Sequence, residues 1–100
     1  MVQGEVFFTK SETARILGVT GRTLYNREQR GDYPPARRDP ANNHRYYTLH
    51  DVIRLQMRSN GRVQPRPICE LLYEKGYAKD ARDALNMVNN TVGQIRGRHG

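Results

Sequence analysis

A short segment in the first third of the chain concentrates side chains that donate hydrogen bonds or carry positive charge. Residues 20–30 read T-G-R-T-L-Y-N-R-E-Q-R. Apart from Leu24 and Glu28, the helix predicted over about 21–30 presents donors or cations almost all round. A solvated helix usually mixes both charge signs, so this bias favours a polyanionic partner. The expected contacts from this segment are Thr20, Arg22, Thr23, Tyr25, Asn26, Arg27 and Arg30.

A second basic cluster follows in two short extended segments, expected at about 36–38 and 45–47. The turn between them contains Asn42-Asn43, and asparagine tolerates the positive φ that a tight hairpin needs. A basic hairpin directly after such a helix indicates a wing that lies along a nucleic-acid backbone or in a minor groove. A solvated hairpin is the alternative. The expected contacts are Arg37, Arg38, Asn42, Asn43, His44 and Arg45.

The preceding residues are suited to positioning the basic helix. Thr9 and Glu12 have the spacing of a capping box for a first helix at about 10–17. Gly18 is suited to the turn that ends this helix, and Thr20 to the N-cap of the next. Ala14, Leu17, Val19 and Leu24 stand where the two helices would pack together. The pattern predicts a helix-turn-helix, whose second helix lies in a DNA major groove.

Composition supports a nucleic-acid partner. The 100 residues include 17 basic and 10 acidic ones, a net charge of +7, and 14 of the basic residues are arginine. Arginine pairs phosphates and guanine edges in bidentate geometry. Residues 10–66 hold 12 basic and 5 acidic groups, whereas residues 67–100 hold 5 and 4, so the affinity should belong to the first two-thirds. No apolar run is long enough to span a membrane, and one cysteine excludes an intramolecular disulfide. We therefore expect a cytoplasmic protein.

The remaining elements are predicted from apolar spacing and caps. Val6 to Phe8 form an apolar lead-in, and a capping box at Thr48 and Asp51 begins a third helix. Residues 59–67 are expected to form a loop. A fourth helix at about 67–75 should end at Gly76, and a last helix should occupy about 79–96, with residues 97–100 disordered.

The last helix carries an apolar stripe at the spacing of a heptad seam, made of Leu85, Val88, Val92 and Ile95. Pairing with a second subunit is the favoured interpretation, and docking on the same chain is the alternative. We accordingly divide the chain into a DNA-binding domain at 1–76 and a dimerisation or docking helix with a short basic tail at 77–100.

The residues that catalysis or metal binding would use are sparse. His44, His50 and His99 lack the spacing of metal ligands, and Cys69 is most simply a small core residue. Glu70 and Glu74 are an i, i+4 pair that solvation explains. We expect no enzymatic activity, no metal and no cofactor.

Several of these residues together resemble the DNA-binding domain of the MerR family of regulators. The matching features are V-T-G-R-T-L, Glu28, Gly31, Pro34 to Arg38, and Asn42-x-x-Arg45-x-Tyr47-Thr48 with Asp51. The resemblance covers roughly residues 8–75. It implies a mostly α-helical winged helix-turn-helix, a following helix pair, and a long helix that joins two subunits. It also implies that Arg22 and Thr23 meet the major groove, and that Arg37, Arg38, Asn42 and Arg45 lie on the wing.

The sequence departs from the family pattern in places. The family commonly has two tyrosines where this chain has Asn26-Arg27, and glycine where it has Asn43. Nothing after the expected dimer helix is long enough for an effector pocket, so no small-molecule effector is expected. The expectation is a homodimeric regulator of transcription that binds specific double-stranded DNA and lacks an effector domain.

The opening F-F-T-K-S-E-T-A-R-I-L-G-V also resembles phage excisionases and related small helix-turn-helix proteins. Those proteins are architectural and bend DNA for recombination, packaging or segregation. An architectural factor of the excisionase, partition-protein or small-terminase type is therefore the second hypothesis. An RNA-binding or protein-interaction module is a third, and the absence of spaced stacking aromatics disfavours the RNA form.

Overall fold

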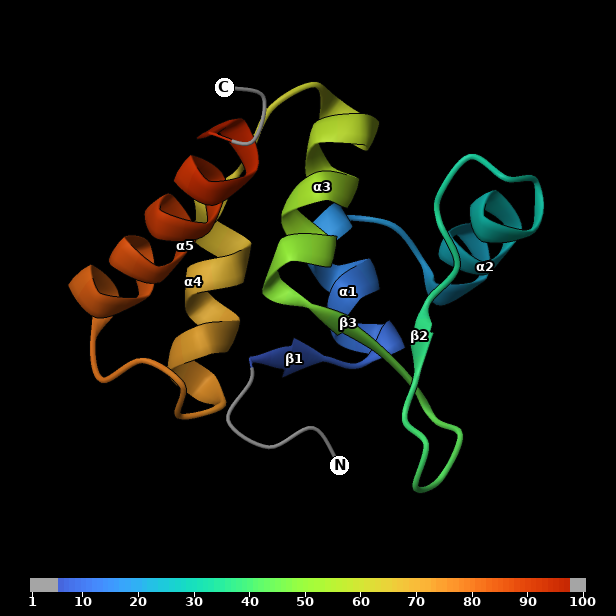
Figure 1. The fold of residues 1–100 in the computed structure, drawn as a ribbon, viewed down its shortest axis with the longest axis horizontal. Helices are drawn as coiled ribbons and strands as arrows, with labels where there is room; N and C mark the ends of the chain where they lie inside the picture. Colours follow the sequence, from blue (N-terminus) through green and yellow to red (C-terminus); the bar gives the residue numbers. More distant parts are fainter. Residues whose placement is uncertain (1–5, 98–100) are drawn as a thin grey trace.

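The computed structural model describes residues 6–97 (Figure 1). Within this range the helices are α1 (Lys10–Leu17), α2 (Gly21–Gln29), α3 (Leu49–Asn60), α4 (Pro65–Glu74) and α5 (Ala81–Arg96). The strands are β1 (Phe7–Phe8), β2 (Arg37–Arg38) and β3 (Arg45–Thr48). The predicted winged helix-turn-helix with a hairpin wing and a C-terminal helix is confirmed. Figure 1 shows α2 and the hairpin on one side of the molecule and α4 with α5 on the other.

The first helix begins and ends at the residues that the caps predict, and the second begins at the predicted residue but ends at Gln29, one residue before the predicted end. The Thr9 hydroxyl accepts from the Glu12 backbone N–H, and the Glu12 carboxylate accepts from the Thr9 N–H at 2.8 Å, which completes the capping box. Gly18 ends α1 with φ 71°, a value that costs other residues strain. The Thr20 hydroxyl accepts from the Thr23 N–H at 3.1 Å and begins α2. Leu24 is buried against α1 at 1% exposure, as predicted.

The apolar lead-in is a strand, which the sequence interpretation missed. β1 pairs antiparallel with β3, and β3 pairs with β2, giving the order β1-β3-β2. Phe7 stands opposite Thr48 and Phe8 opposite Tyr47. Phe8 is fully buried, so the pairing inserts its ring into the core. Two residues are too few to show the alternation of apolar and polar side chains that identifies a strand in a sequence. The strand β1 forms here because it pairs with β3.

The predicted loop at 59–67 is too long. The third helix continues to Asn60 and ends at Gly61 with φ 75°, and the fourth begins at Pro65 rather than at 67. Proline is compatible with a first helical turn because the first N–H groups have no intrahelical acceptor. Gln56, fully buried, holds the short connection by donating to the Gln64 carbonyl and accepting from the Gln64 N–H.

The last helix begins at Ala81, two residues later than predicted, because the Asp80 side chain accepts from the Asp83 N–H as an N-cap. It packs against α4 and α3. One buried core extends from Phe8 to Val88 and includes residues of α5. The last helix shares this core with the rest of the fold, and the predicted division into a DNA-binding domain at 1–76 and a helix at 77–100 stays a prediction. Gly97 follows the helix as its C-cap, and the rest of the tail predicted to be disordered lies outside the described residues.

A half-buried ammonium connects the C-cap of α4 to the beginning of the described chain. Lys75 Nζ donates to the Phe7 carbonyl at 2.7 Å and to Glu12 Oε1 at 2.6 Å. It also lies 4.8, 5.3 and 5.5 Å from the ring centroids of Phe7, Phe8 and Tyr77. Cation–π attraction therefore adds to the ion pair. This contact fixes the helix-turn-helix to the helix pair behind it.

Candidate nucleic-acid interface

The outward face of α2 displays most of the side chains that this segment was predicted to present to a polyanion. Arg22, Tyr25, Asn26 and Arg30 are exposed, and Thr23 is half-buried. Leu24 faces α1, so one side of the helix is anchored and the opposite side is open. Thr20 lies at the N-terminus of the helix, where its hydroxyl bonds the backbone and the Thr23 hydroxyl. This arrangement fits a helix that enters a groove with its first turns.

The two cations of α2 and the arginine that caps its C-terminus differ in their surroundings. Within the described part of the chain, no hydrogen bond or ion pair occupies the Arg22 guanidinium. Arg30 pairs with Asp32 at 2.9 Å, and both side chains are more than half exposed. Arg27 turns inward instead, donating to the Tyr33 hydroxyl at 2.7 Å and to Ser59 Oγ at 3.5 Å. Arg27 is thus engaged within the fold, and its expected contact with DNA stays a prediction.

The hairpin has the expected turn. Asn43 adopts φ 62°, and the Asn42 side chain accepts from the His44 N–H at 2.9 Å. Asparagine therefore meets a requirement that glycine commonly meets in the family that the sequence resembles. His44 is exposed beside the turn. These contacts preorganise the tip.

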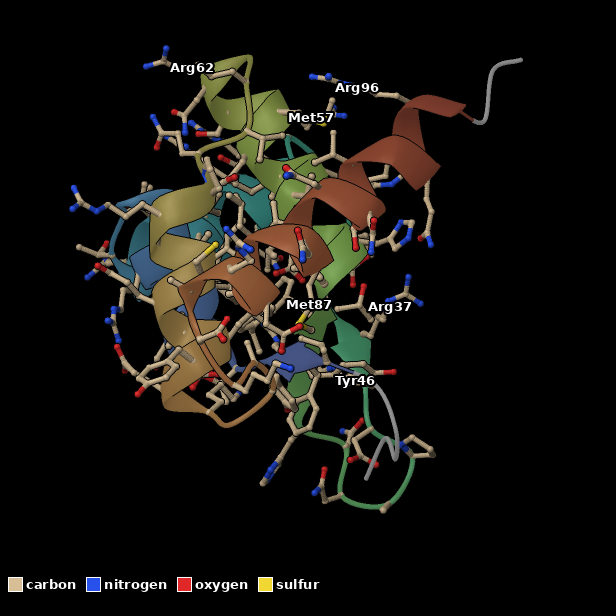
Figure 2. All side chains as sticks on the ribbon, turned by 90° about the vertical axis from the view of Figure 1, so that its left-hand side faces the viewer. Arg37, Tyr46, Met57, Arg62, Met87 and Arg96 are labelled. Carbon is tan, nitrogen blue, oxygen red and sulfur yellow. The ribbon has the colours of Figure 1, made fainter. Side chains whose placement is uncertain are left out.

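The arginines of the hairpin have distinct partners. Arg38, exposed, donates to the Asn43 carbonyl at 3.1 Å. Arg37 binds Asp51 of α3 through two hydrogen bonds, at 2.8 and 3.3 Å. Figure 2, viewed from the side of α5, shows Arg37 near Tyr46, its partner across the strands. Arg45 is only 22% exposed, so its guanidinium lies largely within the fold.

A shallow cleft joins the hairpin to α1. Its volume is about 530 Å³, and both elements contribute basic side chains to its wall. Lys10, the first residue of α1, places its Nζ 5.2 Å from the Tyr25 ring centroid. The sequence interpretation did not single out Lys10, although its place at the start of the first helix was visible. The cleft is lined by Phe7, Thr9, Lys10, Ser11, Arg38, Asp39, Asn43, His44, Arg45 and Tyr46.

The pKa values of Asp51 in α3 and of Tyr47 in β3 are shifted by their surroundings. Burial alone raises the pKa of Asp51, but hydrogen bonds from Arg37 and from the Thr48 backbone outweigh it and keep the pKa below its ordinary value. Burial, and then the nearby Glu28 carboxylate, raise the pKa of Tyr47 to about 12. Among the described residues, the Tyr47 hydroxyl has no partner of standard hydrogen-bond geometry. Asp51 is therefore an anion that holds the hairpin to α3.

The stripe predicted to join two subunits is partly used within the chain. Val88 is 1% exposed and belongs to the core, together with Ala84. Val92 and Ile95 are half-buried against the same core, and Leu85 is 42% exposed. Val88 was expected between subunits, but α3 and α4 cover its face of α5. Leu85 remains the residue of the stripe most open to a partner.

Cys69 is half-buried, and burial raises the pKa of its thiol. In residues 6–97, no three histidine, cysteine or acidic side chains gather as metal ligands would. The helices in that range are too short or too polar to cross a membrane. His99 lies outside the described residues.

The comparison with protein families agrees with this geometry. The family model of the MerR HTH family regulatory protein matches residues 8–59, which run from β1 through the helix-turn-helix and hairpin into α3. No curated protein and no solved structure was found to match. The matched segment covers more than half of the chain and contains the exposed face of α2 and the whole hairpin. The chain therefore belongs to the MerR family of helix-turn-helix regulatory proteins.

Proposed function

We propose that this protein binds specific double-stranded DNA and regulates transcription, with α2 in the major groove and the hairpin against the adjacent backbone. The observation that carries the proposal is the open face of α2. Its first turns expose Arg22 without an internal partner among the described residues, while the opposite side of the helix is anchored by Leu24. An unpaired guanidinium at that place is suited to the O6 and N7 acceptors of guanine.

The hairpin contributes affinity rather than base recognition. Arg38 is exposed on β2, and the exposed tip at Asn42 to His44 extends beyond it. Phosphate contacts of this kind fix the register of a protein on DNA without reading its sequence. The two elements thus have separate tasks, and the cleft between hairpin and α1 adds the positive charge of Lys10.

We further propose that two copies bind adjacent half-sites. Residue Leu85 supports an apolar contact between copies, although the stripe around it is narrower than the sequence pattern indicated. Such a contact would be weak in solution and reinforced on DNA that holds both subunits. Half-sites should then lie about one helical turn or a multiple apart.

Repeated selection from a pool of random duplexes tests specific binding. The protein should enrich a common motif, and a pool member carrying that motif should bind more tightly than an unselected duplex at the same salt concentration. Enrichment of paired motifs with constant spacing supports two copies. Binding without any enriched motif would contradict specific recognition and favour an architectural role.

A further inference from the structure

Glu28 is the acidic exception on the basic helix, and its side chain is only 8% exposed. It lies in the third turn of α2, on the side that faces the hairpin. A carboxylate that is largely removed from water needs hydrogen bonds and a cation. Its partners therefore indicate what it does.

Both arms of the hairpin supply those partners. Glu28 Oε1 accepts from the Ala36 backbone N–H at 3.1 Å, and Ala36 directly precedes β2. Glu28 Oε2 lies 3.8 Å from Arg45 Nη1, and Arg45 begins β3. The Glu28 carboxylate thus contacts the backbone of the residue before the first arm and a side chain of the second arm.

Arg45 has a second attachment to α2. Its guanidinium carbon lies 5.4 Å from the centroid of the Tyr25 ring, one turn before Glu28. Lys10 approaches the same ring at 5.2 Å. Arg45 was predicted from the sequence to contact DNA, but at 22% exposure its guanidinium is engaged between hairpin and helix.

We propose that Glu28 and Arg45 are positioning residues that hold the hairpin at a fixed distance from α2, so that both elements meet DNA in one register. The inference rests on the proposed binding of DNA. A hairpin held in place before binding loses little conformational freedom on the duplex, whereas a loosened hairpin must be ordered at the expense of affinity. Neither residue needs to touch DNA for this effect.

Substitution of Glu28 tests the proposal because two effects have opposite signs. Loss of a negative charge strengthens the general attraction to DNA. Loss of the positioning contacts weakens binding. Glu28→Ala should weaken binding to a duplex by roughly tenfold, the equivalent of ordering one or two side chains on binding. Glu28→Gln keeps an acceptor for the Ala36 N–H and should recover part of the affinity.

Glu70→Ala is the matched control, since Glu70 is an exposed residue of α4 and its removal changes the net charge equally. This variant should bind DNA as tightly as the wild type or more tightly. Thermal unfolding monitored by circular dichroism verifies that each variant is folded at the temperature of the binding assay. If Glu28→Ala binds like Glu70→Ala, the proposal is wrong.

A double-mutant cycle separates positioning from a general structural effect. In an Arg38→Ala background the hairpin no longer carries that exposed basic side chain. The position of the hairpin should then contribute less to DNA affinity. The decrease in affinity caused by Glu28→Ala should shrink there, and the slope of log affinity against log salt should change less than in the wild-type background. An equal decrease in both backgrounds would show that Glu28 does not act through the hairpin.

Arg45→Lys provides a second route if Glu28→Ala does not fold. Lysine keeps the charge for a phosphate contact but lacks the planar group that stacks on Tyr25 and the fork that reaches Glu28. Positioning predicts weaker binding, and a direct phosphate contact predicts little change. Failure of the wild type to bind any duplex would refute the proposed function itself, whereas normal binding by these variants would refute only the positioning role.

Discussion

Arg22 is the side chain on which the proposed recognition of bases depends most. Its place in the first turn of α2 and the absence of an internal partner within residues 6–97 leave its guanidinium available. Arg22→Ala should weaken binding to a selected site by about 1–3 kcal/mol, because a bidentate contact to a base is worth about that much. Fluorescence anisotropy with labelled duplexes measures the change.

Binding to unselected DNA decides what Arg22 contacts. The decrease in affinity for a random duplex should be smaller than the decrease for the selected one. Arg82→Ala is the control of equal charge change, since Arg82 is exposed on α5. An equal decrease on both duplexes would assign Arg22 to a phosphate.

Arg27 illustrates a residue whose role depends on the fold. Its bonds to Tyr33 and Ser59 connect the end of α2 to α3, and its guanidinium stacks 5.7 Å from the Tyr33 ring centroid. Arg27→Ala should lower the free energy of unfolding by about 1.5–3 kcal/mol, the range for hydrogen bonds that involve a charged group. Chemical denaturation measures this. A stable variant with reduced preference for the selected duplex would return Arg27 to the DNA-contacting set.

Among the structural elements, the hairpin and α2 should make separable contributions to binding. Replacing Arg38 by alanine should weaken binding to all duplexes similarly, because phosphates carry no sequence information. The slope of log affinity against log salt should flatten by about 0.9 for each phosphate that the variant no longer neutralises. An unchanged slope would mean that the hairpin faces away from DNA.

The attachment of α4 to α1 should make stability dependent on pH. Burial raises the pKa of Glu12, but hydrogen bonds from Lys75 and from the Thr9 backbone outweigh burial and keep the pKa below its ordinary value of 4.5. A carboxyl group with a lowered pKa stabilises the fold above its unfolded-state pKa, and the contribution disappears as the pH falls through the folded-state value. The protein should therefore become less stable below about pH 4.5.

Lys75→Met tests the origin of this dependence. Without the ammonium, the pKa of Glu12 should no longer be held down by its strongest partner. The variant should be less stable near neutral pH, and the difference from the wild type should narrow in acid. Urea denaturation over a series of pH values measures both. A difference in stability between wild type and variant that stays constant with pH would exclude the Glu12–Lys75 pair as the source of the pH dependence.

Local signals predicted the elements that position the site. The capping boxes at Thr9 and Thr48, the N-cap at Thr20 and the turn at Asn43 act over a few residues, so their spacing is visible in the chain. The strand β1 was missed because Phe7 pairs with Thr48, which is distant in sequence. The internal roles of Arg27 and Arg45 were missed for the same reason, since tertiary contacts decide which arginine has a partner.

In the molecule as a whole, α5 packs into the core while Leu85 stays exposed. Val88→Asp should lower the thermal midpoint strongly, because an unpaired charge would enter the core at a site that is 1% exposed. Leu85→Asp should leave the midpoint nearly unchanged. If copies associate through Leu85, this variant should also bind paired half-sites with less cooperativity. A normal midpoint for Val88→Asp would contradict the burial of α5 against the core.

A nuclear magnetic resonance titration can map the surface that meets DNA. Backbone amide resonances of the ¹⁵N-labelled protein are followed while a selected duplex is added, with an unselected duplex for comparison. Binding as proposed should shift resonances in the first turns of α2, in the hairpin around Asn42 to His44, and at Lys10. The outward face of α4 around Tyr73 should change little. Shifts centred on α4 with α2 unaffected, or no shifts with either duplex at low salt, would contradict the assignment of α2 and the hairpin as the DNA-binding surface.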